Sequence, residues 1–404
     1  MNSIADTVAK LKSVNWDFDY KISYDQTKVS PFNCRKYHSY PATFIPEIPY
    51  SLIEILSQKG DHILDPFGGI GTTFMQALLL ERYAWSYDIN FIASMVCYNL
   101  YWLFDPQLDL NACNKKIRNS CKQYNPSLTY GIRNNDIQKN LSDWFQADTY
   151  REVLFLLHLY ESCNEEIEKR ILEICLSDIL TTTCSQKGGW AYIADNVKPK
   201  PEMLTHRDAI ARFLYCVDNL CFDIGNIKKL LPPSFFDFYS SMQQREHVFN
   251  EDFMLSQRIK ANTIDLVITS PPYPRMIDYV KSQRLSYYFE GRDFREDVRA
   301  EIGARMHRGS KSADQDYLAK INNCNDQIFD LLKSGGYYCC VLPDFGQDSN
   351  DKRKPIIDSI IEHIITSGFN VLFEKSRYIP SGKRDNNIQF ASLINEKIYV
   401  FRKA

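Results

Sequence analysis

The sequence of 404 residues contains no apolar run that approaches the ~18 residues needed to span a bilayer. Its first twelve residues are polar and lack the apolar region of a secretory signal. The twelve cysteines form no CxxC pair and show no Cys/His spacing suited to zinc, and several of them lie inside apolar helical patterns. We therefore expect a soluble, cytoplasmic protein with reduced core cysteines, no membrane contact and no bound metal.

Neither sign of charge dominates the chain. There are 48 Lys+Arg against 50 Asp+Glu, so a surface for nucleic acid, if present, must be local. Aromatic residues are plentiful, with 25 Tyr and 24 Phe, and those outside cores often stack on bases. With 44% hydrophobic residues, the chain is long enough to bury one large core and a second domain.

The stretch 264–273 combines a buried strand with a stiff turn. Residues 264–268 are nearly all apolar, as in a parallel sheet, and the sequence TSPPY follows at 269–273. Neither proline can donate a ladder hydrogen bond, so the chain must leave the sheet in an extended turn. This places Ser270 and Tyr273 at the carboxyl end of a strand, where open α/β sheets bind their ligands. A hydroxyl, free carbonyls and an aromatic ring suit a flat heterocycle that carries an amino group.

A glycine-rich turn lies closer to the N-terminus. A strand over 62–65 ends in Asp65, and the sequence PFGGIGTT then opens a helix from Thr72 to about Arg82. Glycines permit a tight turn and let a ligand approach the backbone. The next strand ends in Asp88, 17 residues after Gly71 and near the ~20 expected for an acid that binds ribose hydroxyls. No Lys follows Gly71 and Asp65 would repel a pyrophosphate, so the turn favours an amino-bearing or cationic ligand with a ribose, such as S-adenosylmethionine.

The TSPPY turn is suited to activating an exocyclic amine, whose lone pair is delocalised into the base. Ser270 and the carbonyl of Pro271 can accept hydrogen bonds from the amine, and Pro272 has no N–H to compete. Tyr273 can stack on a base that has been rotated out of a duplex. We expect Ser270 and Tyr273 to face the hollow beside Gly69.

The remaining chain predicts a discontinuous α/β domain with an insertion. Residues 1–30 suggest a short edge strand or a docking arm, and the proline-punctuated loop 37–49 is either a connection or one wall of a ligand site. We assign 1–104 and 245–404 to the α/β domain and 105–244 to a mainly helical insertion. Within the insertion, the basic and aromatic stretch 185–192 is either a loop that probes DNA or a plain surface loop. Later elements are a strand over 247–252, a strand over 337–343, a helix over 355–367, and an antiparallel hairpin of 369–379 with 397–402.

These motifs resemble those of the S-adenosylmethionine-dependent DNA amino-methyltransferases. Residues 65–73 look like the family's cofactor loop and 269–273 like its catalytic loop. The Ser form of that loop is typical of cytosine-N4 enzymes, whereas Asp or Asn is commoner in adenine-N6 enzymes. The segment from Phe44 to Pro46 is similar to the one that covers the methionine end of the cofactor, and 396–403 fits the family's last strand.

The resemblance implies a Rossmann-like methyltransferase sheet, mostly parallel with a C-terminal antiparallel hairpin, and S-adenosylmethionine as the cofactor. Asp88 would bind the ribose and Asp252 the adenine amino group. The implied cofactor-binding residues are Phe44, Asp65, Pro66, Phe67, Gly69, Gly71, Thr72, Asp88 and Asp252. The implied catalytic residues are Ser270, Pro271, Pro272 and Tyr273.

Two segments are candidates for DNA contact. The family's order of motifs suggests target recognition within 105–244, although this insertion precedes Asp252 instead of following it. The second candidate, 275–311, holds nine Lys/Arg against six Asp/Glu, and 302–311 contains no acid. The candidate phosphate contacts are Arg275, Lys281, Arg284, Arg305, Arg308 and Lys311.

We expect a site-specific methyltransferase that acts on the N4 of a flipped-out cytosine in double-stranded DNA, in a restriction–modification setting with a cognate endonuclease. Adenine N6 on DNA and guanine N2 on tRNA are alternatives, although only about sixty residues precede Asp65, which leaves little room for an RNA-binding domain. A non-catalytic DNA-binding subunit is a third alternative. The intact Ser270, Tyr273, Gly69 and Gly71 argue against it.

Overall fold

A seven-stranded sheet forms the centre of the computed structural model, which describes residues 3–18, 29–131, 139–186, 198–243, 247–307, 312–346, 349–379 and 393–404. The strand order is β3-β2-β1-β4-β5-β7-β6. The strands are β1 (His62–Asp65), β2 (Tyr83–Tyr87), β3 (Val248–Phe249), β4 (Ile264–Thr269), β5 (Leu332–Asp344), β6 (Phe369–Tyr378) and β7 (Asn395–Lys403). The first five strands in this order run parallel, and β7 is antiparallel to both β5 and β6. The predicted mostly parallel sheet with an antiparallel C-terminal hairpin is confirmed.

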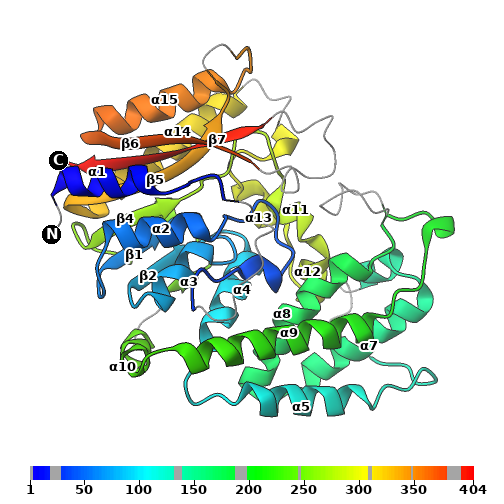
Figure 1. Cartoon of the computed structure of the whole chain (residues 1–404). Coiled ribbons are helices and arrows are strands. Elements are labelled where there is room, and N and C mark those ends of the chain that lie inside the picture. Colours follow the sequence, from blue (N-terminus) through cyan, green and yellow to red (C-terminus); the bar gives the residue numbers. More distant parts are fainter. Residues whose placement is uncertain are drawn as a thin grey trace.

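Helices cover both faces of the sheet (Figure 1). The helices α2 (Glu47–Leu56), α3 (Thr72–Leu79) and α4 (Phe91–Trp102) contact one face, and α14 (Ala313–Leu331) and α15 (Lys354–Thr366) contact the other. Successive strand residues point to opposite faces, so Leu266 and Ile268 join the core on the α2–α4 side while Val267 joins the core beneath α14 and α15. Burial on both faces explains why β4 is apolar throughout, apart from Asp265 and its terminal Thr269.

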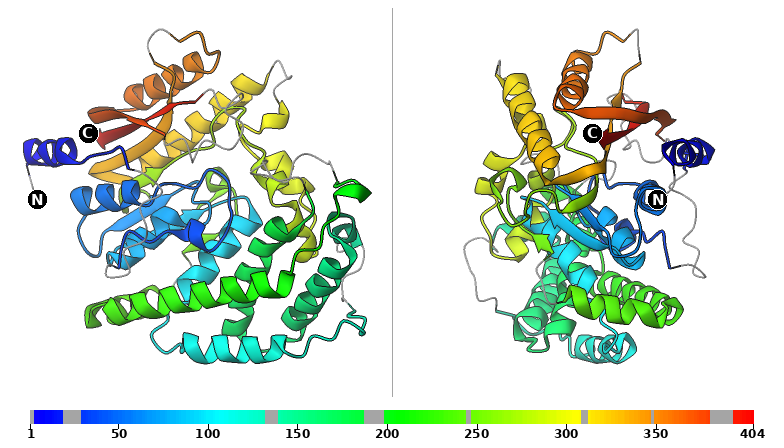
Figure 2. Two further views of the ribbon diagram at one scale, coloured as in Figure 1. Left: turned by 45° about the vertical axis from the view of Figure 1, so that its right-hand side comes forward. Right: turned by 90° about the vertical axis from the view of Figure 1, so that its left-hand side faces the viewer.

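A group of helices lies between α4 and β3 in the chain and on one side of the sheet (Figure 2). These helices are α5 (Leu110–Cys121), α7 (Ala147–Ser162), α8 (Glu166–Thr183), α9 (Ala209–Leu230) and α10 (Pro233–Met242). Of these, α5, α7, α8 and α9 pack mainly on one another, and α8 also contacts α4 and α12 (Arg284–Phe289). The helix α10 is bonded to α4 through the hydroxyl of Tyr239, which donates to the carbonyl of Tyr101. The helical character predicted for 105–244 agrees with the described part of this region, whereas residues 187–192 of the candidate DNA-probing loop lie outside it.

Of the two alternatives for residues 1–30, the described residues 3–18 agree with an arm and not with an edge strand. Residues 4–13 form the helix α1 (Ile4–Ser13), which begins at a capping box between Ser3 and Asp6. Trp16 follows as a buried residue, 1% exposed, with its ring 6.1 Å from that of Phe373 on β6. The segment is therefore a helix and a packed arm, not an edge strand.

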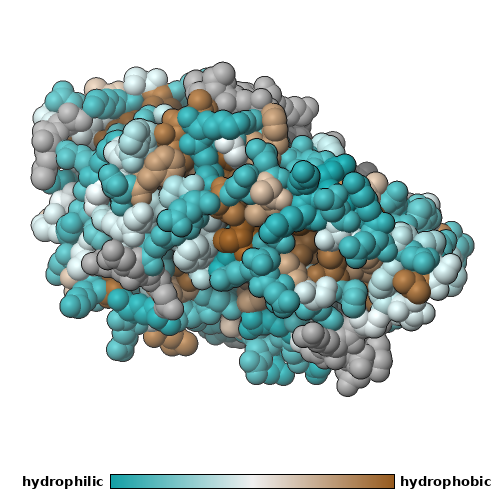
Figure 3. Space-filling model, turned by 90° about the horizontal axis from the view of Figure 1, so that it is seen from below, coloured by the Kyte–Doolittle hydropathy of each residue, from teal (hydrophilic) through white to brown (hydrophobic). Residues whose placement is uncertain are grey.

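The surface seen from below is mostly hydrophilic, with hydrophobic atoms gathered in smaller areas (Figure 3). Within the part of the chain that the structure describes, no helix has both the length and the apolar character that crossing a membrane requires.

Candidate active site

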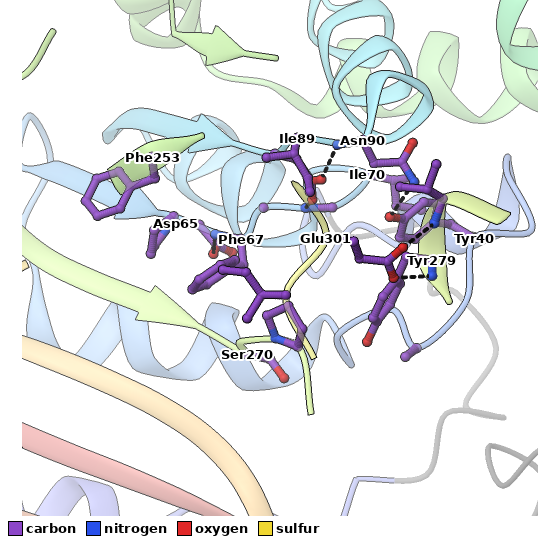
Figure 4. A pocket seen from close by; sticks show the side chains of 18 of the residues that line it. Tyr40, Asp65, Phe67, Ile70, Ile89, Asn90, Phe253, Ser270, Tyr279 and Glu301 are labelled. Carbon is purple, nitrogen blue, oxygen red and sulfur yellow. Dashed lines mark hydrogen bonds between the residues drawn. The ribbon is translucent and has the colours of Figure 1, made fainter. Parts of the chain in front are cut away.

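A pocket lies at the carboxyl ends of β1, β2 and β4 (Figure 4). Its walls come from short segments that are far apart in the sequence. The lining residues fall within 40–44, 65–70, 88–90, 251–253, 270–272, 279–280 and 300–302, together with Thr72. This is the edge at which parallel sheets bind ligands, so the sheet topology brings together the segments that follow β1, β2, β3 and β4, and the other segments pack against them.

The glycine-rich turn forms the floor of the pocket between β1 and α3. Gly71 has φ +87°, and a Cβ at this position would lie 2.4 Å from the sulfur of Cys97 on α4. Gly69 has φ +53°, and its N–H donates a 2.9 Å hydrogen bond to the carboxylate of Asp88. The left-handed conformation and the close approach of α4 together explain why glycine is required at Gly71.

Asp65 ends β1 with its carboxylate almost fully enclosed. The side chain is 4% exposed and accepts hydrogen bonds from the hydroxyl of Thr269 at 2.7 Å and from the N–H of Phe67 at 3.1 Å. Burial raises the pKa of Asp65 to about 6, and these two hydrogen bonds oppose the rise. The carboxylate is therefore ready to pair with positive charge that enters the pocket.

Two further acids follow the ends of the next strands. Asp88, after β2, accepts hydrogen bonds from the N–H groups of Gly69 and Asn90 at 2.9 and 2.8 Å. Burial raises the pKa of Asp88 to about 7. Asp252, after β3, accepts a 3.0 Å hydrogen bond from the N–H of Met254. Asp65, Asp88 and Asp252 thus present carboxylates to one pocket from three neighbouring strands.

The charged residues that line the pocket indicate which kind of ligand it can bind. Five of the described residues that line the pocket are acids. None of the described lining residues is Lys, Arg or His. Carboxylates accept hydrogen bonds from hydroxyl and amino groups and attract positive charge, but they repel phosphate. The acids are Asp65, Asp88, Glu251, Asp252 and Glu301. The pocket therefore fits a ligand with a ribose, amino groups and a positive centre, as S-adenosylmethionine has.

The catalytic-loop candidates divide between the pocket and its surroundings. Ser270 and Pro272 line the pocket. The carbonyl of Pro272 accepts a 2.8 Å hydrogen bond from the hydroxyl of Tyr317 on α14. Tyr273 does not line the pocket, and its hydroxyl donates to Glu396 on β7 at 3.2 Å. Of the two residues expected beside Gly69, the structure places Ser270 there and turns the hydroxyl of Tyr273 toward the hairpin.

Tyr273 keeps its proton in this environment. Burial raises the pKa of Tyr273 well above the ordinary value of 10.0, and the carboxylate of Glu396 adds to this rise, while a hydrogen bond from Ser270 opposes it. The phenol is therefore a hydrogen-bond donor at neutral pH.

The structure brings most of the predicted cofactor and catalytic residues to one place. Those that line the pocket are Phe44, Asp65, Pro66, Phe67, Gly69, Thr72, Asp88, Asp252, Ser270 and Pro272. Gly71, Pro271 and Tyr273 belong to the same two loops without lining it. The proline-punctuated loop also supplies a wall, through residues 40–44.

Several lining residues carry no signal in the sequence. Tyr279 and Glu301 enter the pocket from the segment after the catalytic loop (Figure 4). Glu301 is 6% exposed and accepts hydrogen bonds from the N–H groups of Tyr279 and Val280 at 2.6 and 3.4 Å. Burial raises its pKa to about 8. Neither residue belongs to a recognisable motif, so only the path of the chain identifies them.

The residues predicted to contact DNA differ in how exposed they are. Arg284 is 2% exposed and its guanidinium lies 5.4 Å from the ring centroid of Phe294, so its assignment as a phosphate contact was wrong. Arg275 pairs with Asp314. Lys281 is partly exposed and Arg305 is exposed. Arg308 and Lys311 lie outside the described residues.

Comparisons with known proteins find similarity to DNA methyltransferases. A family model described as DNA methylase matches residues 5–92, which include the glycine-rich turn and Asp88. The chain is 25% identical over 309 residues to the type II methyltransferase M.BsoBI of Geobacillus stearothermophilus, covering 67% of this chain and 56% of that protein. It is 25% identical over 256 residues to the type II methyltransferase M.MvaI of Kocuria varians, covering 59% and 52%.

A third relative is more distant and more fully covered. The chain is 21% identical over 396 residues to the type II methyltransferase M.MjaII of Methanocaldococcus jannaschii, covering 77% of this chain and 71% of that protein. The chain thus spans about half the length of M.BsoBI and M.MvaI.

Proposed function

Because the chain belongs to the DNA amino-methyltransferase family, we propose that it transfers a methyl group from S-adenosylmethionine to the exocyclic N4 of a flipped-out cytosine in double-stranded DNA. One observation carries this proposal. Ser270, in the TSPPY loop, lines the same pocket as Asp65, Asp88 and Asp252. A hydrogen-bond acceptor for an amine therefore adjoins a site suited to a ribose and a positive centre.

The cofactor roles follow from the acids and the turn. When bound, S-adenosylmethionine supplies an electrophilic methyl group on a positively charged sulfur. Asp88, fixed by Gly69 and Asn90, is placed to accept hydrogen bonds from ribose hydroxyls. We assign the adenine amino group to Asp252, and the positive charge of the methionine end to Asp65. Phe44 and Phe67 supply apolar surface in the same pocket.

The target amine is assigned to the TSPPY loop. Ser270 and the carbonyl of Pro271 would accept hydrogen bonds from its N–H groups, which draws the nitrogen lone pair out of the ring. Pro271 is preferred as the backbone acceptor because the carbonyl of Pro272 is already bonded to Tyr317. Tyr273 would stack on the extruded base. The chief contribution of the protein is to hold the nitrogen in line with the methyl group.

The preference for cytosine N4 over adenine N6 rests on Ser270, since Asp or Asn is commoner at this position in the adenine enzymes. The restriction–modification setting rests on the relatives, which are named type II methyltransferases, and it implies a cognate endonuclease in the same cytoplasm. We assign target recognition to the helical region 105–244 and phosphate contact to the exposed part of 275–311.

Nucleoside composition after a labelled reaction tests the proposal. The full chain would be incubated with labelled S-adenosylmethionine and with separate pools of unmethylated DNA and tRNA, and the products digested to nucleosides. We expect label only in N4-methylcytosine from DNA. Label in N6-methyladenine would show that the target base is adenine instead of cytosine. Label in tRNA guanine would show that the substrate is tRNA instead of DNA. Absence of transfer to every pool would overturn the proposal.

A further inference from the structure

Tyr273 is anchored to the C-terminal hairpin through a buried ion pair. Its hydroxyl donates to Glu396 at 3.2 Å, and Glu396 in turn is bonded to Arg377. Arg377 and Glu396 are direct cross-strand partners on β6 and β7. Arg377 is 1% exposed, so its buried guanidinium must be stabilised by hydrogen bonds to the groups around it.

The other partners of Arg377 come from the far end of the chain. Its Nε donates to the carbonyl of Trp16 at 2.8 Å and its Nη2 to the carbonyl of Phe18 at 3.1 Å. The carboxylate of Asp17 accepts a 3.0 Å hydrogen bond from the N–H of Tyr378. We call residues 14–18 the N-terminal strap. Figure 1 shows the preceding helix α1 beside the hairpin strands.

These contacts form one continuous connection from the strap to the catalytic loop. The strap carbonyls and Glu396 together satisfy the guanidinium of Arg377. Arg377 in turn fixes the orientation of the Glu396 carboxylate, which holds the hydroxyl of Tyr273. The loop's second anchor is independent, because Tyr317 on α14 holds the carbonyl of Pro272. The loop is thus fixed from both faces of the sheet within three residues of Ser270.

We propose that Glu396 and Arg377 are positioning residues for the catalytic loop. We propose that the N-terminal strap contributes by holding the guanidinium of Arg377. They hold the ring of Tyr273, and with it the turn that carries Ser270, in a single orientation. Their effect on turnover rests on the proposed function, whereas their effect on loop order does not. A plain structural tie between β6 and β7 would stabilise the fold without changing the loop.

Two variants and one matched control separate these roles. Tyr273→Phe removes only the hydroxyl, and Glu396→Gln removes only the charge that pairs with Arg377. Glu374→Gln is the control, because Glu374 is an exposed residue of the same hairpin, 3.9 Å from Lys397 on β7. Each variant of the full chain would be measured for hydrogen exchange in the peptide 270–279, for S-adenosylmethionine affinity, and for single-turnover methylation of DNA.

We expect faster exchange over 270–279 in both Tyr273→Phe and Glu396→Gln, and not in Glu374→Gln. We expect the methylation rate of both variants to fall roughly tenfold or more, because a displacement of the reacting groups by about 1 Å costs up to ~100-fold. Cofactor affinity should stay within about twofold of the wild type, since Tyr273 does not line the pocket. The double variant should be no slower than the slower single variant, because both changes break one connection.

Unchanged exchange over 270–279 in Tyr273→Phe would overturn the inference, even if Glu396→Gln proved too unstable to measure. Parallel loss of cofactor affinity and rate in all three variants would also overturn it, because that pattern reports general damage to the fold. A wild-type protein that methylates no substrate would overturn the proposed function alone. The exchange measurement would still decide whether Glu396 orders the loop.

Discussion

The hydroxyl of Thr269, the last residue of β4, donates a 2.7 Å hydrogen bond to the carboxylate of Asp65, the last residue of β1. The two residues are 204 positions apart in the sequence, and each stands at the start of a loop that lines the pocket. Because Thr269 is fully buried, water cannot replace this bond. It therefore couples the glycine-rich turn to the TSPPY turn at the point where both leave the sheet.

Thr269→Val should weaken cofactor binding and destabilise the protein. Removing the hydroxyl leaves a buried carboxylate short of one donor, which costs about 1–3 kcal/mol and raises the pKa of Asp65 further above its present value. Thermal unfolding and calorimetric titration with S-adenosylmethionine would measure both effects. Thr263→Val is the matched control, because that hydroxyl bonds the carbonyl of Lys260 at an exposed turn. Equal behaviour of the two variants would contradict the coupling.

Cofactor affinity should rise with pH. Burial holds the pKa of Asp65 at about 6 and that of Asp88 at about 7, so both carboxylates ionise as the pH passes through this range. A positive ligand with hydroxyl donors binds the ionised forms, and affinity should increase by about tenfold or more between roughly pH 5.5 and 8. Calorimetry across that range, in buffers of matched ionic strength, measures the change. A cofactor affinity that does not change with pH would show that these two acids do not bind the cofactor.

The stability of the protein without ligand should change in the opposite direction. A carboxyl whose pKa is raised on folding holds a proton that the unfolded chain releases above its ordinary pKa of 3.8. The contribution of these two protonated carboxyls to the free energy of unfolding is therefore complete below pH 3.8. It is lost as the pH rises through 6 to 7. Saturating cofactor should reduce this loss, because it stabilises the ionised carboxylates.

Gly71→Ala should destabilise the fold. The substitution forces a side chain into the left-handed region at φ +87° and places its Cβ 2.4 Å from the sulfur of Cys97. Overpacking of this kind costs about 1–3 kcal/mol, in addition to the backbone strain. Gly225→Ala on α9 is the control, because its Cβ meets nothing within 4 Å and should stabilise the helix by about 0.5–1 kcal/mol. Chemical unfolding of both variants provides the comparison, and similar midpoints would contradict the packing explanation.

Arg305→Ala and Arg284→Ala should act on DNA binding in different ways. Arg305 is exposed, so its loss should weaken binding to all sequences and reduce the salt dependence of affinity by about one unit of slope. Arg284 is buried over Phe294, so its loss should lower stability while leaving the salt slope unchanged. Binding titrations at several salt concentrations, with thermal unfolding alongside, measure both. A reduced slope for Arg284→Ala would contradict its burial.

The sequence was sufficient for the elements that carry strong local patterns. The buried strand β4 is a nearly continuous apolar run, and the glycines that follow β1 and the prolines that follow β4 mark two of the loops that line the pocket. Parallel strands place their carboxyl ends at one edge, which is why Asp65, Asp88 and Ser270 could be predicted to meet.

The remaining features depend on packing, which a local pattern does not contain. The count of charged residues predicted an exposed Arg284, but this residue is 2% exposed and its guanidinium lies over the ring of Phe294. Tyr279 and Glu301 reach the pocket only because the chain after TSPPY folds back over it. The connection from Tyr273 to Arg377 and Trp16 joins residues from both ends of the chain, so no window of sequence reveals it.

The rate of methyl transfer by Ser270→Ala tests the central claim most directly. Single-turnover formation of N4-methylcytosine would be compared in the wild type, in Ser270→Ala and in the surface control Ser334→Ala, with cofactor affinity measured in each. Because Ser270 lines the pocket as the proposed acceptor for the amine, we predict a loss of about 100-fold or more in rate for Ser270→Ala, with cofactor affinity nearly unchanged. A rate close to that of the wild type, or equal losses of rate and cofactor affinity, would contradict the account.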